Sequence, residues 1–361
     1  MTTLAQLTTL RVGGPIGELV EVEFEADFID AVREADAAGT PVLVLGGGSN
    51  LLPADAGFDG RVIRDLRTAT TVQDDGFCGG VSLTAPAGTA WDNLVAQAVS
   101  EGWVGLESLS GIPGSAGAAP VQNIGAYGGE FAQTFASARV WDRVESKVRT
   151  MFAADMAFGY RDSVLKRSVS DALGATPRFV VLDLTLQMRF GTQSAPIAYA
   201  GLAQALGLEA GATAPTADVR AAVLGLRASK GMVLDAGDRD TWSAGSFFTN
   251  PVVPDALVPE GAPRFPAAEG GDGDATGNVS TKTSAAWLIE HAGFAKGFAL
   301  PGSGAAISSK HSLALTNRGE ATAAQLVDLA RHVRDGVREA FGIELVPEPY
   351  VFDDKGARVQ L

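Results

Sequence analysis

The chain has 361 residues, of which 46% are hydrophobic and 19% charged, and its formal net charge is -14. This acidic balance argues against a nucleic-acid or anionic-membrane partner, because phosphate-backbone binding needs a basic face. No run of about 18 apolar residues occurs, and the N-terminal stretch lacks a basic start followed by an apolar core. We therefore expect a globular cytoplasmic protein with no membrane span and no secretory signal, long enough for two domains of ordinary size.

The cysteine content also limits the chemistry. Cys78 is the only cysteine, so an internal disulfide is excluded and no cluster of thiols can bind a metal. We expect a reducing compartment, no metal, and a role for Cys78 as a small buried apolar residue. We further expect a monomer whose partners are small molecules.

The first part of the chain predicts a β-α-β unit that ends in a glycine turn. A strand is expected over 19–24, an amphipathic helix near 28–37 and a buried strand over 41–45. The last strand leads into GGGSN, residues 46–50, where the absence of side chains lets backbone N–H groups approach a ligand. A dinucleotide fingerprint would need a glycine at Leu51 and a helix opening there, so a Rossmann fold is disfavoured and a plain tight turn stays an alternative.

A second glycine cluster occupies residues 110–130 and follows a helix expected over 91–101. Its 21 residues include six glycines, two prolines and four alanines, with almost no charge. Small side chains at this density let peptide groups line a groove, as an extended phosphorylated cofactor requires. The alternative is a glycine-rich core crossing between sheets, and we favour the cofactor interpretation.

Further strands are expected over 136–141 and 178–190, after which the composition changes. A helix is expected from Thr216, with Val219, Val223 and Leu226 on one face. We accordingly predict a first domain over 1–190, with lobes over about 1–67 and 68–190, and a second domain over 200–361. The last segment of the second domain is expected to pack back on the first.

The second domain begins with connectors and ends in a long helix. Residues 254–279 are rich in proline and glycine and predict a surface excursion. The last helix is expected over 322–341, with Thr322 and Gln325 as a capping box. Its core face has Leu326, Leu329, Ala330, Val333 and Val337, and His332 lies off that face, as a solvated side chain would.

The stretch AGSFFTN, residues 244–250, places Ser246 between a glycine and two phenylalanines. A buried hydroxyl costs free energy unless it is hydrogen-bonded. The three histidines, His291, His311 and His332, all lie far downstream, so we expect no histidine base behind Ser246. Phe247 and Phe248 are expected to have a packing role.

Six stretches occur in order across nearly the whole chain: VLVLGGGSNLL, GIPGSAGAAPVQNIGAYGGE, FGYRDSVLK, AGSFFTNPVV, AAWLIEHAG and ELVPEPYVF. The ordered set resembles the UDP-N-acetylenolpyruvoylglucosamine reductases, flavoenzymes that make UDP-N-acetylmuramate for peptidoglycan. Tyr199, in PIAYAG, resembles the loop tyrosine of the longer type in that family. The resemblance implies an α+β fold, in which a two-lobed FAD-binding fold of the vanillyl-alcohol-oxidase (PCMH) type precedes an α+β substrate-binding domain.

The resemblance implies FAD as the cofactor and NADPH as the reductant. It also implies that the cofactor lies on backbone rather than on a helix N-terminus, which accounts for the missing third glycine. The cofactor-binding residues that it implies are Gly46, Gly47, Gly48, Ser49, Asn50, Leu51, Pro113, Gly114, Ser115, Gly117, Asn123, Gly125, Ala126 and Tyr127.

The implied reaction is the reduction of an enolpyruvyl ether, for which the resemblance assigns three catalytic residues. Ser246 would donate the proton, while Arg161 and Glu348 would stabilise the enolate-like charge. A carboxyl beside developing negative charge has a raised pKa, so Glu348 would act as a hydrogen-bond donor. On the residues alone, the preferred interpretations are a surface arginine paired with Asp162 and a surface glutamate.

The substrate-binding residues implied by the resemblance are Tyr160, Tyr199, Lys230, Asn250 and His291. Some relatives have glutamine in place of His291, and a surface histidine is an equal alternative there. Two other functions stay open: another FAD-dependent oxidase of the same fold, and a noncatalytic flavin- or nucleotide-binding subunit. An NAD-dependent Rossmann enzyme would bind no flavin.

Overall fold

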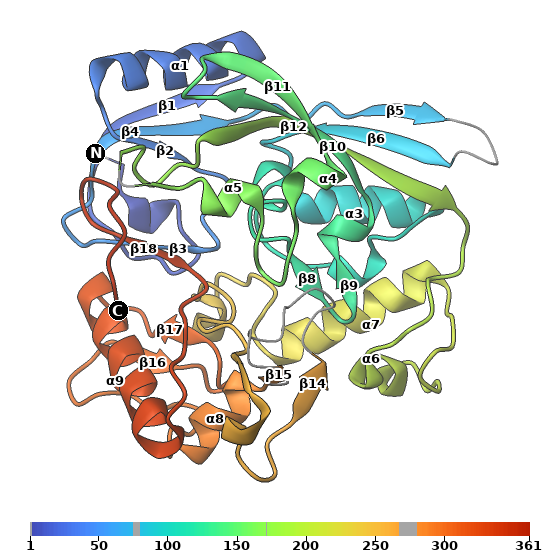
Figure 1. The fold of residues 1–361 in the computed structure, drawn as a ribbon, viewed down its shortest axis with the longest axis vertical. Helices are drawn as coiled ribbons and strands as arrows, with labels where there is room; N and C mark the ends of the chain where they lie inside the picture. Colours follow the sequence, from blue (N-terminus) through green and yellow to red (C-terminus); the bar gives the residue numbers. More distant parts are fainter. Residues whose placement is uncertain (1, 75–79, 171, 267–279) are drawn as a thin grey trace.

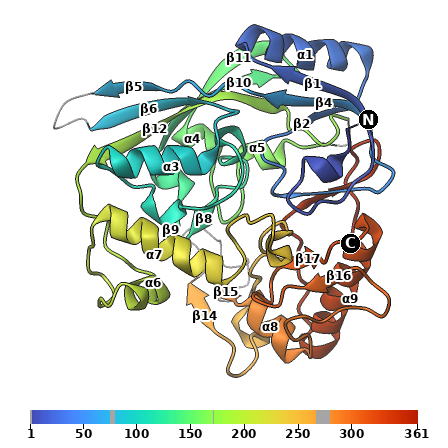
Figure 2. The same cartoon turned by 180° about the vertical axis from the view of Figure 1, so that it is seen from behind.

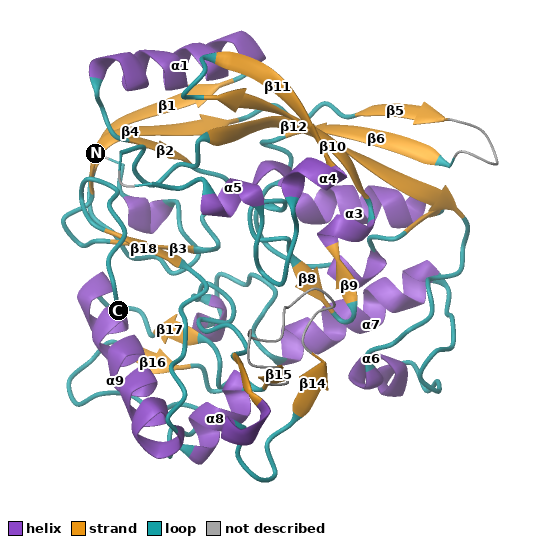
Figure 3. Cartoon of the chain, in the orientation of Figure 1, coloured by secondary structure: helices purple, strands orange, loops and turns teal. Residues whose placement is uncertain are grey.

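The computed structural model describes residues 2–74, 80–170, 172–266 and 280–361. The prediction for Cys78 therefore concerns a residue outside the described part of the chain. Three layers follow one another in Figure 1: strands and one helix at the top, short helices and glycine-rich loops in the middle, and a mixed C-terminal part below. Figure 3 shows how much of the middle layer is loop.

The first sheet is parallel and has three strands in the order β1-β4-β2. It is formed by β1 (Ile16–Val22), β2 (Val42–Val44) and β4 (Phe58–Asp65), and α1 (Glu25–Ala38) connects β1 to β2. The predicted β-α-β unit is confirmed, although its two strands both pair with β4 and not with each other. Phe28 and Val32 of α1 pack against Ile63 in a core that also takes Trp141 from the second sheet.

The second sheet is antiparallel and lies between the first sheet and the glycine-rich loops. Its strands run β11-β10-β12-β6-β5, and β7 pairs with the far end of β12. The predicted strands over 136–141 and 178–190 are confirmed as β10 and β12. The strands are β5 (Thr71–Asp74), β6 (Val81–Pro86), β7 (Trp103–Val104), β10 (Phe135–Asp142), β11 (Lys147–Phe152) and β12 (Phe179–Phe190).

Short helices cover the inner face of the second sheet. The predicted helix over 91–101 is confirmed as α3 (Trp91–Ser100), whose Trp91, Leu94 and Val95 are buried in the largest core cluster. Two one-turn helices, α4 (Ala153–Met156) and α5 (Val164–Arg167), lie on the same side. The glycine-rich stretch passes beneath them and forms a small hairpin from β8 (Gly125–Ala126) and β9 (Gly129–Glu130).

Two helices connect the second sheet to the C-terminal part. They are α6 (Ala200–Ala205) and α7 (Thr216–Ser229), and the predicted start at Thr216 is confirmed. Val219 and Val223 are buried in a small core, against which Leu226 and Tyr127 pack. Because Tyr127 belongs to the glycine-rich stretch, this core joins parts on both sides of the predicted boundary, and the boundary itself stays a prediction.

The described part of the predicted surface excursion, residues 254–266, is mostly exposed, as predicted, but it is not irregular throughout. Strand β13 (Val252–Pro254) leads into it, β14 (Arg264–Pro266) lies within it, and both pair with β15 (Ser280–Thr283). The strand partner lies beyond the stretch, so proline and glycine content inside it could not reveal the pairing. Residues 267–279 lie outside the described part of the chain.

The C-terminal core is closed by α8 (Ala285–His291), β16 (Ala305–Ile307), β17 (Leu315–Asn317) and α9 (Ala323–Phe341). Thr322 and Gln325 form the predicted capping box, with Gln325 N donating to Thr322 Oγ1 at 3.1 Å and Thr322 N to Gln325 Oε1 at 3.2 Å. All five predicted core residues of α9 are buried. His332 is exposed as predicted, and its ring stacks on Phe298.

The last described segment runs back from this C-terminal part to the first sheet. Strand β18 (Tyr350–Phe352) pairs in parallel with β3 (Leu51–Pro53), which directly follows the first glycine turn. Figure 2 shows this segment from behind as it rises beside the N-terminal loops. The pairing carries residue 348 to the end of the first glycine turn.

Candidate active site

The two glycine clusters face each other backbone to backbone. A Cβ on Gly47 would lie 2.7 Å from the Gly114 Cα, and one on Gly46 would lie 2.3 Å from the Ser115 Oγ. Ser49 strengthens the contact by donating its hydroxyl to the Pro113 carbonyl at 3.0 Å. Side chains larger than hydrogen are thus excluded at positions 46 and 47 by direct contact.

The first glycine turn has open hydrogen-bond donors. The N–H groups of Gly46, Gly47, Gly48 and Ser49 have no acceptor in the parts of the chain that the structure describes. Consecutive unpaired N–H groups with no side chains in front of them suit the oxygens of a phosphate. The turn follows β2 and leads into β3, not into a helix, so the geometry fits a dinucleotide pyrophosphate held by backbone.

The other predicted cofactor residues form the surroundings of these turns. Leu51 begins β3, and Asn50 donates its Nδ2 to the Glu348 carbonyl at 3.4 Å. A Cβ on Gly117 would lie 2.5 Å from the Ala87 Cβ. Ala126 forms part of the β8-β9 hairpin, so the whole set lies on two loops that meet.

Asn123 uses its side chain within the protein. Its Nδ2 donates to the Gly159 carbonyl at 3.0 Å and to Glu130 Oε2 at 3.2 Å, and its Oδ1 accepts from Ala132 N at 3.0 Å. The residue is buried and has a positive φ of 41°. Asn123 thus ties the second glycine cluster to the turn that carries residues 160 and 161, and its contact with a cofactor stays a prediction.

Arg161 and Glu348 form an ion pair, with 2.9 Å between Arg161 Nε and Glu348 Oε1. The alternative pairing with Asp162 is not formed, because Asp162 pairs with Arg167. Arg161 Nη2 also donates to the Gly125 carbonyl at 2.8 Å, and a Cβ on Gly125 would lie only 3.1 Å from Arg161 Nη1. The arginine therefore lies flat against the second glycine cluster.

Glu348 is a mostly buried carboxyl, and its side chain is 17% exposed. Burial raises the pKa of Glu348, and it does so more strongly than Arg161 and Lys166 lower it. The expected direction is thus observed, but the cause in the protein alone is burial. A carboxyl with a raised pKa can hold a proton close to neutral pH and donate a hydrogen bond.

Ser246 belongs to a segment that runs antiparallel to the segment of Glu348. Glu348 N donates to the Phe247 carbonyl at 2.8 Å, and Thr249 N donates to the Val346 carbonyl at 3.0 Å. Within the described ranges, the half-buried Ser246 hydroxyl has no hydrogen-bond partner. Phe247 and Phe248 are both buried in the C-terminal core, so their predicted packing role is confirmed.

Tyr160 and Asn250 meet on the other side of Arg161. Asn250 N donates to the Tyr160 hydroxyl at 3.4 Å, and Asn250 Oδ1 accepts from Ala285 N at 3.0 Å, at the start of α8. Lys282 of β15 places its Nζ 4.7 Å from the centre of the Tyr160 ring. Burial raises the pKa of Tyr160, so its hydroxyl stays protonated and can donate a hydrogen bond.

A second group of predicted substrate residues gathers around Tyr127. The Tyr199 ring meets the Tyr127 ring edge to face at 5.4 Å, and Lys230 Nζ lies 6.0 Å from the centre of the Tyr127 ring. Tyr199 is 44% exposed. Burial lowers the pKa of Lys230, and the nearby charges of Arg227 and Lys296 lower it further.

The same cations surround His311. Burial lowers the pKa of His311 to about 4, helped by Lys230, Lys296 and Arg227. Leu313 N donates to His311 Nδ1 at 3.2 Å, so the proton of the neutral ring is on Nε2. Mutual repulsion within a cluster of cations is relieved by an anion, so this cluster suits an anionic group such as a diphosphate.

His291 lies apart from these groups. Its ring is exposed and stacks on Trp287 at 3.7 Å, with Nδ1 2.8 Å from the Trp287 carbonyl oxygen. This packing along α8 matches the surface alternative. The substrate contact of His291 stays a prediction.

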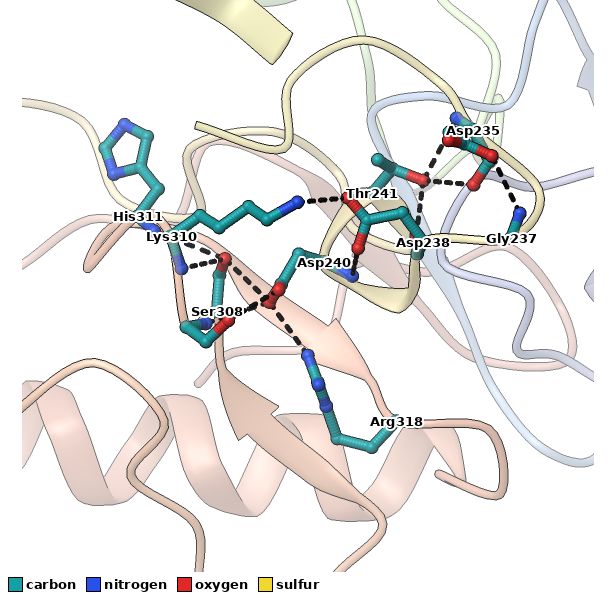
Figure 4. A network of polar contacts seen from close by, with 10 residues as sticks. Asp235, Gly237, Asp238, Asp240, Thr241, Ser308, Lys310, His311 and Arg318 are labelled. Atoms are coloured by element: carbon teal, nitrogen blue, oxygen red, sulfur yellow. Dashed lines mark hydrogen bonds and ion pairs between the residues drawn. The ribbon is translucent and has the colours of Figure 1, made fainter. Parts of the chain in front are cut away.

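A polar network supports the serine loop from behind, and Figure 4 shows it. The buried Asp240 accepts hydrogen bonds from Ser308 Oγ at 2.9 Å and Ser309 Oγ at 2.6 Å, and it pairs with Arg318 Nη1 at 2.8 Å. Lys310, in the same turn as His311, pairs with Asp238. The network joins the loop before Ser246 to the turn that carries His311.

Several residues of the site were not predicted from the sequence. Gln122 donates its Nε2 to the Glu348 carbonyl at 3.4 Å, and its buried Oε1 has no partner among the described residues. Arg227 and Lys282 are cations without a described carboxylate partner beside predicted substrate residues. Gln122 could have been noticed as a polar residue in an almost uncharged stretch, whereas nothing local marks Lys282 or Asp240.

Comparisons with known protein families agree with this geometry. A family model described as "FAD binding domain" matches residues 18–150. It covers both glycine clusters, including the first glycine turn with its open N–H groups. The fold and the site therefore define an FAD-dependent oxidoreductase of the α+β, PCMH-type fold.

A second family model, "UDP-N-acetylenolpyruvoylglucosamine reductase, C-terminal domain", matches residues 237–352. Reductases of that name from Saccharopolyspora erythraea and Cutibacterium acnes are 51% and 49% identical, over 98% and 96% of this chain and 95% and 88% of theirs. The crystal structure of the Thermus caldophilus reductase matches with a TM-score of 0.64 and 27% identity over 97% of each chain. The chain belongs to the UDP-N-acetylenolpyruvoylglucosamine reductase family.

Proposed function

We propose that the protein reduces UDP-N-acetylglucosamine enolpyruvate to UDP-N-acetylmuramate with NADPH as the donor. The observation that carries this proposal is the Arg161–Glu348 pair, whose glutamate segment pairs with the segment of Ser246, in a chain of this family. The product is a peptidoglycan precursor, so the protein would serve cell-wall synthesis and, through it, cell shape and division. We place the enzyme in the cytoplasm as a monomer; the described helices include none that could span a membrane.

The glycine turns would hold the cofactor. When bound, FAD would supply the hydride chemistry between NADPH and the enolpyruvyl substrate. The open N–H groups of residues 46–49 would bind the pyrophosphate, and the second cluster would line the rest of the cofactor. The unpaired Oε1 of Gln122 would accept a hydrogen bond from it.

Arg161 and Glu348 would stabilise the negative charge that develops beside the substrate carboxylate. The ion pair and the Gly125 carbonyl fix the guanidinium plane before substrate arrives, so little reorganisation is needed during the reaction. Burial shifts the pKa of Glu348 upward, and in its protonated form Glu348 would donate a hydrogen bond to the carboxylate. Removal of one such donor from a preorganised site costs about a hundredfold to a thousandfold in rate.

Ser246 would donate a proton to the carbon next to the carboxylate. Hydride addition at one carbon of the double bond and proton addition at the other together convert the enolpyruvyl ether into a lactyl ether. The segment of Ser246 pairs through its backbone with the segment of Glu348, and the Ser246 hydroxyl has no hydrogen-bond partner among the described residues. A weak acid suffices when it is held in line with so reactive a carbon.

The cations near Tyr127 would bind the diphosphate of the nucleotide sugar. Lys230, Arg227 and Lys296 lie close enough together to lower the pKa of His311, and an anion would compensate this shared positive charge. Tyr199, which is partly exposed and packed on Tyr127, would cover the bound diphosphate. Tyr160 and Asn250 would contact the sugar end nearer Arg161.

Stopped-flow absorbance of the flavin tests the proposed function. The expected result is bleaching by NADPH under anaerobic conditions, followed by recovery when UDP-N-acetylglucosamine enolpyruvate is added. Recovery with oxygen or a sugar lactone but not with the enolpyruvyl substrate would indicate another FAD oxidase. Purified protein that stays colourless after incubation with FAD would contradict a flavoenzyme, and slow or absent bleaching would favour a noncatalytic subunit.

A further inference from the structure

We infer that Lys166 is a positioning residue of the catalytic centre, which holds the backbone of Arg161 and adds a second positive charge beside Glu348. The inference rests on the proposed roles of Arg161 and Glu348. Lys166 Nζ donates to the Arg161 carbonyl at 2.8 Å, and the lysine is half-buried on the one-turn helix α5.

Arg161 needs support because its backbone is in the left-handed region. Its φ is 55°, a strained conformation that non-glycine residues rarely adopt. The turn is closed by Gly159 N to the Asp162 carbonyl at 3.0 Å and Asp162 N to the Gly159 carbonyl at 3.2 Å. The Lys166 ammonium group binds the carbonyl at the bend itself, so it fixes the peptide plane that follows Arg161.

Lys166 is itself held from two sides. Ser163 Oγ accepts from Lys166 N at 3.2 Å and donates to the Val121 carbonyl at 2.8 Å. The buried Ser163 thus connects α5 to the second glycine cluster, one residue before Gln122. This chain of contacts relates the guanidinium of Arg161, the ammonium of Lys166 and the glycine cluster in one rigid unit.

Both carboxylates and guanidinium groups act on the pKa of Lys166. Glu348 and Asp162 raise its pKa, Arg358 and Arg161 lower it, and burial lowers it more than any of these. Glu348 in turn has Arg161 and Lys166 as the cations that lower its pKa. Asp162 is already paired with Arg167, so Glu348 is the carboxylate that Lys166 influences.

Lys166→Met tests the inference, with Lys166→Arg as the conservative variant and Arg167→Met as the matched control. Arg167 lies on the same helix but is exposed and contacts only Asp162 and the Ala157 carbonyl among the described residues. In the holoenzyme we expect Lys166→Met to lower kcat for flavin reoxidation by the enolpyruvyl substrate about tenfold to a hundredfold, with KM within about threefold. Lys166→Arg and Arg167→Met should stay within about threefold of wild type.

A second readout does not depend on turnover. Removal of the Lys166 charge should raise the pKa of Glu348, which ¹³C carboxyl NMR of the holoenzyme measures, with Glu348→Gln to assign the signal. We expect a rise of at least about 0.5 in Lys166→Met and none in Arg167→Met. If Lys166→Met does not fold, Lys166→Gln gives the same titration.

An unchanged Glu348 pKa in Lys166→Met, or the same rise in Arg167→Met, would overturn the inference. A normal rate in Lys166→Met would overturn it as well. If wild-type holoenzyme is not reoxidised by the enolpyruvyl substrate while the NMR difference persists, the proposed function fails and the positioning role stands.

Discussion

The cofactor turns and the catalytic centre are neighbours, but one is lined by backbone and the other by side chains. Gly47 and Gly114 meet with no room for a Cβ, and the donors of the first turn are peptide N–H groups. The proposed catalytic residues Arg161, Glu348 and Ser246 come from three distant segments and would act through their side chains. Changes on the cofactor side should therefore act through shape, and changes in the centre through individual chemical groups.

Of the substitutions considered, Ser246→Ala should have the largest effect on the rate of the reaction. Loss of the proton donor should slow flavin reoxidation by the enolpyruvyl substrate about a hundredfold to ten-thousandfold, while bleaching by NADPH stays near normal. Stopped-flow measurement of the two half-reactions provides the internal control. Equal slowing of both would show that Ser246 is structural and would remove it from the catalytic centre.

Gly47→Ala tests the close contact between the two glycine turns. A methyl group would lie 2.7 Å from the Gly114 Cα, so the two turns must separate, and we expect the purified protein to retain little flavin. Absorbance of the released flavin against protein concentration measures this. Gly225→Ala is the control, because it lies in α7 with no atom within 4 Å of the new Cβ.

Flavin content near wild type in Gly47→Ala would show that the close contact between the two glycine turns is not required for cofactor binding. The control is expected to gain stability, by roughly 0.5 to 1 kcal/mol, since alanine favours helix over glycine. Both glycines are replaced by the same group, so the difference isolates the contact.

Asp240→Asn tests how much the polar network around Asp240 stabilises the loop before Ser246. The buried carboxylate accepts charge-assisted hydrogen bonds from Arg318 and two serines, and its neutralisation should lower the free energy of unfolding by about 2 kcal/mol. Urea denaturation measures the change. The exposed Asp328→Asn on α9 is the control.

His311 should give the smallest effect, through pH. Its pKa of about 4 in the folded protein is below the value of about 6.5 expected when unfolded, so the unfolded chain binds more protons between these values. Stability from His311 is therefore complete above about pH 6.5 and is lost as pH falls toward 4. We expect His311→Gln to reduce this pH dependence by on the order of 1 kcal/mol, after allowance for solvent screening.

Denaturation curves at several pH values check this, with the exposed His332→Gln as control for loss of a histidine. An identical pH dependence in His311→Gln and wild type would contradict a cationic cluster around His311. Pyrophosphate should also raise the pKa of His311 in an NMR titration, because the anion offsets the neighbouring charges.

The sequence predicted the backbone half well because its signal is local. Glycine density over 46–48 and 110–130 marks close approach of peptide groups, and the α9 capping box needs only Thr322 and Gln325. The side-chain half needed the family resemblance. On local evidence Arg161 pairs with its neighbour Asp162, whereas it actually pairs with Glu348, which only the β18–β3 pairing brings near.

The elements that were not predicted also depend on partners far away in the sequence. Strands β13 and β14 need β15 as a partner across a long insertion, and Lys282 reaches Tyr160 only through that sheet. Asp240 lies in an ordinary acidic loop, and its four hydrogen bonds come from residues 308, 309 and 318. Contacts of this kind depend on tertiary packing and leave no periodic pattern.

The return of residues 346–352 to the N-terminal loops has a consequence for synthesis of the protein. A ribosome releases the glycine turns early, and they can meet while the chain is still growing. The proposed catalytic pair cannot form until Glu348 has emerged, because Glu348 lies just before β18, among the last described residues. Each new molecule should therefore gain the ability to hold its cofactor before it gains the ability to use it.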